Sequence, residues 1–351
     1  MEKNDTLGKK LLITGGGRSN ITNAEFDEHL FLEKFGEAKK YLFSPLSRFG
    51  VESTIHFFDD LGMPTKIEAE KRVFPKSDSA QSVWDALLLY MKRGSVSVLS
   101  HSEVVGLEHD DSRITGVRLK NGEVYQATRY VLATGGKSRP ETGSTGDGFR
   151  FLKELGHKVN NQKPALVPLK VREDWVHALS GLALEDAKFT FFHQRQKQAS
   201  KRGKLLFTHF GLSGPLVLNM SKSVSEYLEY GPVTVSIDMM PSINHGELDR
   251  RILDTFEVAK NKQIKNVLKE LLSPLLIPTL LELVRIDADK AVNMVSRDER
   301  QRLGEKIKNM TMTVTGLMGF EKAVVSSGGV HLEEVDFRTM QSRLYPNLHI
   351  S

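Results

Sequence analysis

The chain has no cysteine among its 351 residues. This absence excludes disulfides, a thiol nucleophile, a CxxC redox pair, iron-sulfur ligation and the usual structural zinc sites. Any redox chemistry must therefore use a bound cofactor. The eleven histidines show no HExxH motif or other paired spacing, which favours surface and core positions over metal ligation, and no metal site is expected.

Long hydrophobic runs are also absent. The most apolar run, "LLSPLLIPTLLELV", is too short and too interrupted by proline to span a bilayer, and the N-terminal "MEKNDTLGKK" lacks the apolar region of a signal peptide. A cytoplasmic protein is therefore predicted. Net charge is +5, but Lys and Arg are spread among 44 acidic residues without a basic tail. Neither a nucleic acid nor a membrane is expected as a partner.

The first 158 residues mix helical and strand patterns. Residues 26–62 read as mostly helical, and the apolar spacing of Val83, Leu87 and Met91 predicts a helix that stops at Gly94. Apolar alternation then predicts a β-meander with a turn at 121–122 and a buried strand at 130–133. A glycine turn follows and opens a helix that should turn Phe149, Leu152 and Leu155 towards a core.

The secondary-structure pattern of the sequence changes twice after residue 158. Strands separated by Pro and Gly predict a small barrel or sandwich, residues 244–308 read as purely helical, and the last thirty residues return to strands. The sequence therefore predicts an α/β domain with two inserts. Its expected parts are an α/β domain over 1–158 and 322–351, a β-barrel subdomain over 159–243 and 309–321, and a helical subdomain over 244–308.

The stretch "TGGGRSN", Thr14 to Asn20, is the first candidate for a ligand site. Consecutive glycines allow positive φ and let the backbone approach a ligand, and successive N–H groups can bind an anion. A guanidinium at Arg18 could reach a phosphate. The alternative is a tight structural loop with Arg18 in a salt bridge.

A second candidate is "YVLATGG", a buried strand that delivers Ala133, Thr134 and Gly135 to the carboxyl end of a sheet, where open α/β folds bind ligands. Glu2 is the third. In dinucleotide-binding folds an acidic residue about 20 residues after the glycine fingerprint binds the adenosine ribose, although an isolated terminal Glu is usually a solvated charge.

These motifs occur together and in the same order as in one known family. "TGGGRSN", "YVLATGG", "STGDGF", "LLFTHFGLSGP" and the C-terminal "TVTGLMGFEKAVVSSGGVHLEEVDF" resemble the BaiN-like bacterial flavoproteins, also called the aminoacetone oxidase family of NAD(P)- and FAD-dependent oxidoreductases. The resemblance covers essentially the whole chain. It implies a discontinuous FAD domain of the glutathione-reductase (Rossmann) type, interrupted by a β-barrel subdomain and a helical subdomain.

The resemblance also implies roles for individual residues. Glu2 matches the ribose-binding acid, Val104 matches the residue whose backbone meets the adenine, and "SSGGV" at 326–330 is similar to a strand that approaches the flavin. The remaining cofactor-binding residues implied by the family are Thr14, Gly15, Gly16, Gly17, Arg18, Asn20, Ala133, Thr134 and Gly135.

Two departures from the family pattern matter. Ser19 stands where the family usually has cysteine, so no thiol lies near the flavin. Family members also have a GxGxxG unit before the residue that matches Glu2 and a glycine-rich helix after the residue that matches Ser351. The resemblance therefore predicts a fragment with an incomplete FAD site and FAD affinity lowered by several orders of magnitude, since each charge-assisted bond contributes roughly 1.5–3 kcal/mol.

The function expected from the sequence is an FAD-dependent oxidoreductase that moves a hydride or electrons through the flavin. The donor could be NAD(P)H, and the substrate an amine or another small organic molecule. No catalytic acid or base is identified, and His209 and Arg18 are weak candidates on the substrate side. The alternative is a cofactor-free fragment without turnover. A third possibility, an RNA-modifying flavoprotein like the glucose-inhibited-division tRNA enzymes, is disfavoured because a basic helical tail and cysteine are missing.

Overall fold

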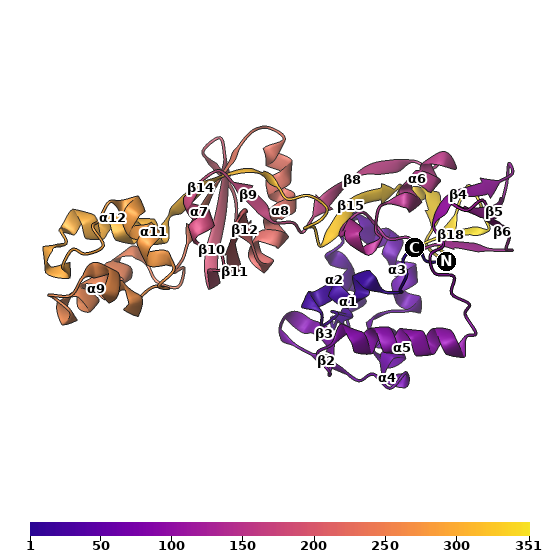
Figure 1. Ribbon diagram of the computed structural model, residues 1–351, viewed down its shortest axis with the longest axis horizontal. Coiled ribbons are helices and arrows are strands. Elements are labelled where there is room, and N and C mark those ends of the chain that lie inside the picture. The colour runs from indigo at the N-terminus through magenta and orange to yellow at the C-terminus, as the bar shows by residue number, and fades with distance from the viewer. The chain divides into compact units, whose positions relative to one another are not determined.

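The computed structural model describes residues 1–351 and separates into two compact units (Figure 1). Unit 1 comprises residues 1–162 and 328–351, and unit 2 comprises residues 163–327. The boundaries that the sequence suggested lie a few residues earlier on both sides. Each unit has its own hydrophobic core and is described separately below.

The N-terminal part of unit 1 is mainly helical, as predicted for residues 26–62. The side chain of Asp27 accepts hydrogen bonds from the N–H groups of His29 and Leu30, which begins the second helix at the next residue. Ser79 caps the fifth helix, which ends before Gly94. The helices are α1 (Lys9–Ile13), α2 (Glu28–Glu33), α3 (Lys39–Arg48), α4 (Val51–Asp60) and α5 (Ala80–Arg93). A small antiparallel sheet runs in the order β1 (Thr22–Asn23), β3 (Arg72–Pro75), β2 (Thr65–Ile67).

The predicted meander is confirmed as an antiparallel sheet of β4 (Val104–His109), β5 (Ile114–Leu119) and β6 (Val124–Tyr125). Gly122 forms the turn after β5 with φ of 90°. The predicted buried strand is β7 (Tyr130–Leu132), which pairs in parallel with β18 (Leu348–Ile350). The sheet continues through β17 (Gln341–Ser342) to β16 (Val335–Asp336). The two chain segments that form unit 1 thus meet in one sheet.

Helix α6 (Asp147–Glu154) packs on this sheet by nearly the face predicted, since Leu152 and Leu155 are buried as expected. Gly148, Phe151, Leu152 and Leu155 are buried, whereas Phe149 is only partly buried. The helix begins at Asp147, and Gly148 then lies against the end of β7, which sets the phase of the buried stripe. Strands β8 (Val159–Ala165) and β15 (Val325–Val330) pair as a separate two-stranded sheet.

Unit 2 contains a closed six-stranded barrel, so the barrel is confirmed and a sandwich is not. Its strand order is β10-β11-β12-β9-β14-β13. Phe189, Phe191 and Phe207 are buried inside it. The strands are β9 (Leu169–Val171), β10 (Ala183–His193), β11 (Gln196–Thr208), β12 (Gly211–Ser213), β13 (Val233–Asp238) and β14 (Met310–Leu317). Helices α7 (Trp175–Ala178) and α8 (Pro215–Leu228) belong to the barrel.

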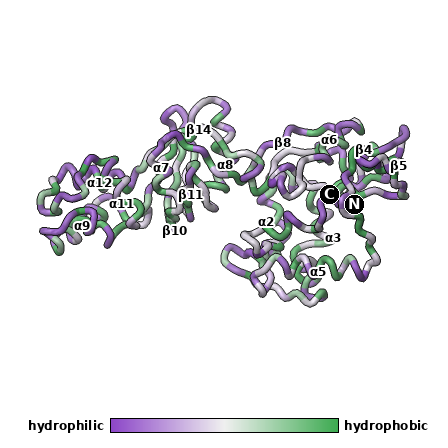
Figure 2. The backbone as a smooth tube through the Cα atoms, in the orientation of Figure 1, coloured by the Kyte–Doolittle hydropathy of each residue, from purple (hydrophilic) through white to green (hydrophobic).

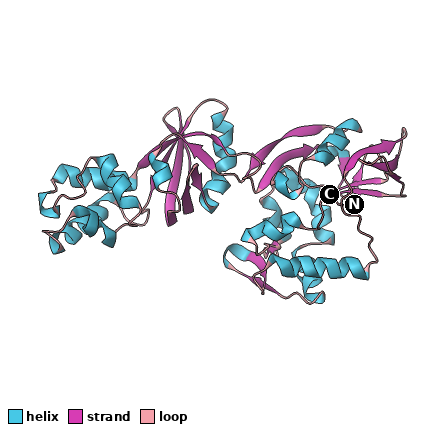
Figure 3. Ribbon diagram, in the orientation of Figure 1, coloured by secondary structure: helices cyan, strands magenta, loops and turns pink.

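The predicted helical insert between β13 and β14 is confirmed (Figure 3). Its helices are α9 (His245–Val258), α10 (Ile264–Val267), α11 (Leu276–Val284) and α12 (Arg297–Lys308). Capping boxes at Asn244/Glu247 and Ser296/Glu299 begin α9 and α12. Helix α12, which Figure 2 colours as largely hydrophilic, packs against both α9 and apolar α11, and buried residues of all three share a continuous core with the barrel. None of the helices is long and apolar enough to cross a membrane.

Short 3₁₀ turns connect several of these elements. They are η1 (Thr14–Gly16), η2 (Gly36–Ala38), η3 (Ala69–Lys71), η4 (Pro140–Thr142), η5 (Leu268–Glu270), η6 (Val292–Met294) and η7 (Leu332–Glu334).

Candidate functional site

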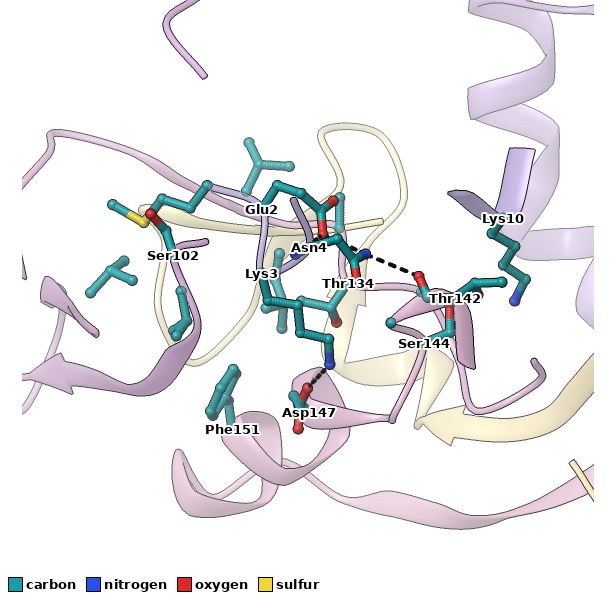
Figure 4. A pocket seen from close by; sticks show the side chains of 18 of the residues that line it. Glu2, Lys3, Asn4, Lys10, Ser102, Thr134, Thr142, Ser144, Asp147 and Phe151 are labelled. Atoms are coloured by element: carbon teal, nitrogen blue, oxygen red, sulfur yellow. Dashed lines mark hydrogen bonds and ion pairs between the residues drawn. The ribbon is translucent and has the colours of Figure 1, made fainter. Parts of the chain in front are cut away.

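A pocket of about 640 Å³ lies in unit 1 beside the end of β7 (Figure 4). Pockets of this size are typical of small-molecule sites. One wall is the N-terminal segment 1–4, and the opposite wall is residues 130–135 of β7 and the turn that follows it. The structure therefore brings together Glu2, Val104, Ala133, Thr134 and Gly135, which were predicted separately from distant parts of the sequence.

The N-terminal wall is held by backbone pairing with the segment that precedes β4. The N–H of Glu2 donates to the carbonyl of Leu99 at 2.8 Å, and the N–H of Ser102 donates to the carbonyl of Glu2 at 2.8 Å. The Glu2 carboxylate accepts hydrogen bonds through Oε1 from the backbone N–H and the side-chain amide of Asn4, at 2.9 and 2.8 Å. Its position is therefore fixed, and its other carboxylate oxygen has no partner within the chain.

Lys3 and Asp147 form a polar bridge across the pocket, which sequence reasoning missed. Lys3 Nζ donates to Asp147 Oδ2 at 2.7 Å and to Thr145 Oγ1 at 2.5 Å, and Thr145 Oγ1 donates to Asp147 Oδ2 at 2.6 Å. Burial opposes ionisation of Asp147, but Lys3 and the Thr145 hydroxyl outweigh it and lower the pKa of this carboxyl group. The signal was present in "STGDGF", where an acid opens a helix directly after a glycine turn.

The turn after β7 brings backbone close to α6. Gly135 has φ of 69°, and a Cβ on Gly148 would overlap Thr134 Oγ1. Only glycine at position 148 therefore allows the first turn of α6 to approach the end of β7 this closely. The small residues of "ATGG" and "STGDGF" also leave space for the pocket at the carboxyl end of β7.

Apolar side chains from β4, β5 and α6 form the inner wall. They are Val104, Leu107, Val117 and Phe151. On the β7 side, Val131 is 69% exposed. The combination of an apolar wall, a carboxylate at one end and exposed small-residue backbone at the other fits the adenosine half of a dinucleotide.

A second cation, Lys10, lines the pocket. Lys10 Nζ donates to the carbonyl and the hydroxyl of Ser138, at 3.0 and 2.8 Å. Burial lowers the pKa of Lys10, and the Glu141 carboxylate partly offsets this effect. The cations that line the pocket are Lys3, which pairs with Asp147, Lys9, which pairs with Asp5, and Lys10.

The glycine triplet is not part of this pocket. Gly15, Gly16 and Gly17 have φ of 56°, 69° and 86°, and Ser19 follows with φ of 57°. The positive φ values agree with the backbone conformation that the glycines predict. The residues of 14–20 do not line the pocket, however, so the roles of Thr14, Gly15, Gly16, Gly17, Arg18 and Asn20 at a cofactor stay predictions.

Arg18 is held by acidic side chains, which is the alternative that the sequence left open. Its guanidinium pairs with Glu68 at 2.5 Å and with Asp78, and lies 4.2 Å from the centre of the Phe74 ring. Lys66 and Arg18 lower the pKa of Asp78, and the same pair of cations lowers the pKa of Glu68. In this arrangement Arg18 fastens the loop to β3 and the segments that flank it.

The other residues considered from the sequence lie elsewhere. His209 is exposed in the turn between β11 and β12 of unit 2, where its ring packs against Phe210 at 4.8 Å between centroids. Within "SSGGV", Gly328 and Gly329 have φ of 91° and 123° in β15. Neither segment lines the pocket, so their expected roles near a flavin or a substrate stay predictions.

Comparison with known proteins places the chain in a family. Residues 1–351 match the family described as HI0933-like protein Rossmann domain. The chain is 29% identical over 352 residues to the 3-dehydro-bile acid delta(4,6)-reductase of Clostridium scindens, with 100% of this chain and 84% of the reductase covered. It is 29% identical over 346 residues to the ribosomal RNA dihydrouridine synthase of Escherichia coli, covering 97% and 81%, and 28% identical over 350 residues to that of Haemophilus influenzae, covering 98% and 82%.

Solved structures give a weaker likeness. The open conformation of a flavocytochrome c3 fumarate reductase aligns with a TM-score of 0.38 and 13% identity, over 97% of this chain and 65% of that chain. A score this low supports no detailed comparison. The family match confirms the α/β class with a Rossmann-type FAD domain and the family that the sequence motifs indicated.

Proposed function

Because the chain belongs to the HI0933-like family, we propose that it is a flavin-dependent oxidoreductase that binds FAD by the adenosine half in the pocket beside β7. The observation that carries this proposal is that one cavity is lined both by the Glu2 carboxylate, which Asn4 holds in place, and by the turn at residues 133–135. Glu2 would accept hydrogen bonds from the ribose hydroxyls. Lys3 and Lys10 would neutralise phosphate charge.

The reaction is proposed from what the names of the relatives have in common. One is a delta(4,6)-reductase of a 3-dehydro bile acid and two make dihydrouridine in ribosomal RNA. Both names describe the saturation of a carbon–carbon double bond that is conjugated to a carbonyl. A bound flavin would supply a hydride to one carbon of the double bond, and a proton would be added to the other carbon to complete the saturation. The protein would bind the substrate, orient the double bond and exclude water.

The electron donor and substrate are proposed only by class. NAD(P)H is the proposed donor, because flavin reductases of this chemical type need a two-electron reductant. The substrate is either a small conjugated ketone or a uridine in RNA, and the amine considered from the sequence stays a prediction. A cytoplasmic location also stays a prediction.

The adenosine site can be tested by comparing FAD with FMN, which lacks the adenosine half. We expect FAD to bind much more tightly than FMN in a flavin-fluorescence titration. Glu2→Gln keeps the oxygen that holds Asn4 and removes the charge offered to the ribose, so FAD affinity should fall about tenfold, equivalent to about 1.4 kcal/mol. FMN affinity should not change. Glu103→Gln, an exposed carboxylate outside the pocket, is the matched control and should alter neither affinity.

Turnover can be tested with the flavin-loaded protein. NADH or NADPH oxidation would be followed with a conjugated 3-oxo-diene steroid and, separately, with uridine-containing ribosomal RNA. Saturation of either double bond supports the proposed reaction and identifies the substrate class. A chain that binds no flavin and consumes no NAD(P)H would instead support the alternative, a cofactor-free protein without turnover of its own.

A further inference from the structure

The hairpin between β10 and β11 of unit 2 concentrates positive charge. The segment 188–204, here called the basic hairpin, contains six Lys or Arg residues and no Asp or Glu. Two of the six are neutralised at its base, where Arg202 pairs with Asp186, and Lys204 pairs with Glu185 at 2.7 Å. The remaining four are exposed and form no ion pair: Lys188, Arg195, Lys197 and Lys201.

Two acidic groups near this hairpin are already paired, whereas Glu226 of α8 is exposed and forms no ion pair. Asp238 of β13 lies opposite Lys188 in the register, and its carboxylate pairs with Lys308 at 2.7 Å. Glu229, just after α8, pairs with Lys163 at 2.5 Å. The unpaired charge around the hairpin is therefore mainly positive, which attracts a polyanion at long range.

Aromatic rings lie at the tip end of the hairpin, where His193 directly precedes the turn that carries Arg195. Tyr227 of α8 is 5.6 Å from Phe191 and 5.4 Å from His193, measured between ring centroids, and His193 is 6.4 Å from Tyr230. Tyr230 is 77% exposed, and the buried Nδ1 of His193 has no hydrogen-bond partner. A row of rings that ends in an exposed tyrosine offers a stacking surface for a planar base.

The tip of the hairpin places arginine at a position that would suit glycine. His193 pairs with Gln196, and the two turn residues between them, Gln194 and Arg195, have φ of 49° and 66°. Two-residue turns of this type favour Asn-Gly because a side chain disfavours positive φ. The arginine at the tip therefore makes the turn less favourable and adds a charge at an exposed position.

We propose that the basic hairpin, together with Tyr227 and Tyr230, binds RNA by contacting phosphates with its cations and stacking unpaired bases on the tyrosines. This inference rests on the RNA branch of the proposed function, since it identifies how an RNA substrate would be held. RNA is favoured over an anionic membrane. Strands β10 and β11, helix α8 and the turn after it expose only one large hydrophobic side chain, that of Tyr230. Membrane binding would need an apolar face.

The test is RNA affinity without flavin, measured by fluorescence anisotropy with a labelled RNA stem-loop that has a uridine-rich loop. The charge variant combines Arg195→Gly, Lys197→Gln and Lys201→Gln. Glycine suits the positive φ at residue 195, so this variant should keep its thermal stability. Tyr230→Ala tests stacking separately.

A matched control removes the same charge from the helical insert. Arg250→Gln, Lys262→Gln and Lys269→Gln lie at exposed positions in or beside α9 and α10. We expect the hairpin variant to weaken RNA binding at least tenfold and to reduce the slope of log affinity against log salt by about 2, as expected for three lost phosphate contacts at roughly 0.7–0.9 each. Tyr230→Ala should weaken binding about tenfold. The control should change affinity less than about threefold, because its charges would make no phosphate contact.

Two results would overturn the inference. Equal losses in the hairpin and control variants would mean that only net charge matters. Hairpin-dependent binding to phosphatidylserine vesicles, with RNA affinity unchanged, would assign the hairpin to a membrane. The flavin titration and the turnover assay distinguish failure of the RNA inference from failure of the proposed function. If the chain binds FAD and reduces a small conjugated ketone but acts on no RNA, the oxidoreductase proposal stands and the RNA inference does not.

Discussion

Replacing Gly148 by alanine tests the close packing of α6 on the end of β7. In an ordinary helix interior, alanine is more favourable than glycine by about 1 kcal/mol. Here the new Cβ would overlap Thr134 Oγ1, while the next neighbour, Leu132 Cδ2, would lie at 3.5 Å, an ordinary contact. Overpacking of this kind costs about 1–3 kcal/mol. The net change expected for Gly148→Ala is therefore a destabilisation of about 0–2 kcal/mol.

The same substitution should change sign when the obstructing oxygen is removed. In a Thr134→Ala background the overlap disappears, and Gly148→Ala should stabilise the protein by about 1 kcal/mol through helix propensity alone. The coupling free energy in the double-mutant cycle should then be about 1–3 kcal/mol. FAD affinity should fall in the single Gly148→Ala variant, because the displaced helix carries Asp147 at the pocket wall.

The free energies can be measured by urea unfolding with Trp84 fluorescence. The chain has two tryptophans, and Trp84 belongs to unit 1. Trp175→Phe in all variants would leave Trp84 as the only reporter, with its indole N–H donating to the Leu7 carbonyl in the folded state. A coupling energy near zero would refute the reasoning, since it would mean that the helix accommodates the methyl group without contacting Thr134.

Two further predictions concern the C-terminal part of unit 1. Burial opposes ionisation of Glu334, but buried His157 at 2.7 Å lowers its pKa from the ordinary 4.5. The ionised Glu334 should therefore stabilise the fold above pH 4.5, and this stabilisation should be lost as the pH falls through the lowered pKa of the folded state. In a plot of melting temperature against pH, Glu334→Gln should reduce the loss of stability at acid pH. Gly328→Ala should destabilise by more than about 2 kcal/mol, because its φ is 91° and a Cβ would lie 2.6 Å from the Asn161 carbonyl oxygen. Gly156→Ala, with φ of 88° in open space, should cost only about 1 kcal/mol in the same urea assay, and equal costs would contradict this reading.

Much of the fold could be predicted because local patterns determine it. The helix 80–93 follows from apolar spacing and a terminal glycine, and the strand at 130–132 follows from a short apolar run before a glycine turn. The buried face of α6 was predicted for Leu152 and Leu155 but not for its first turn. Whether Phe149 or Phe151 is buried depends on Gly148 meeting Thr134, a tertiary contact that periodicity does not contain.

The candidate site was predicted in part for the same reason. Glu2 was recognised as an acidic residue at the position expected of a ribose ligand, and Ala133–Gly135 as small residues directly after a buried strand. Both line one pocket. The environment of Arg18 depends on Glu68 and Asp78, which are distant in sequence. The sequence alone therefore could not decide whether Arg18 forms a salt bridge or contacts a phosphate. The basic hairpin was missed because charge was counted over the whole chain, whereas one β-turn gathers it locally.

The most direct test of the central claim is the visible absorption spectrum of the purified chain after incubation with FAD and gel filtration. The account predicts a bound-flavin spectrum that travels with the protein, and its loss when FMN replaces FAD, because the pocket beside β7 holds the adenosine half. A colourless protein after incubation with FAD, or equal retention of FMN, would contradict it.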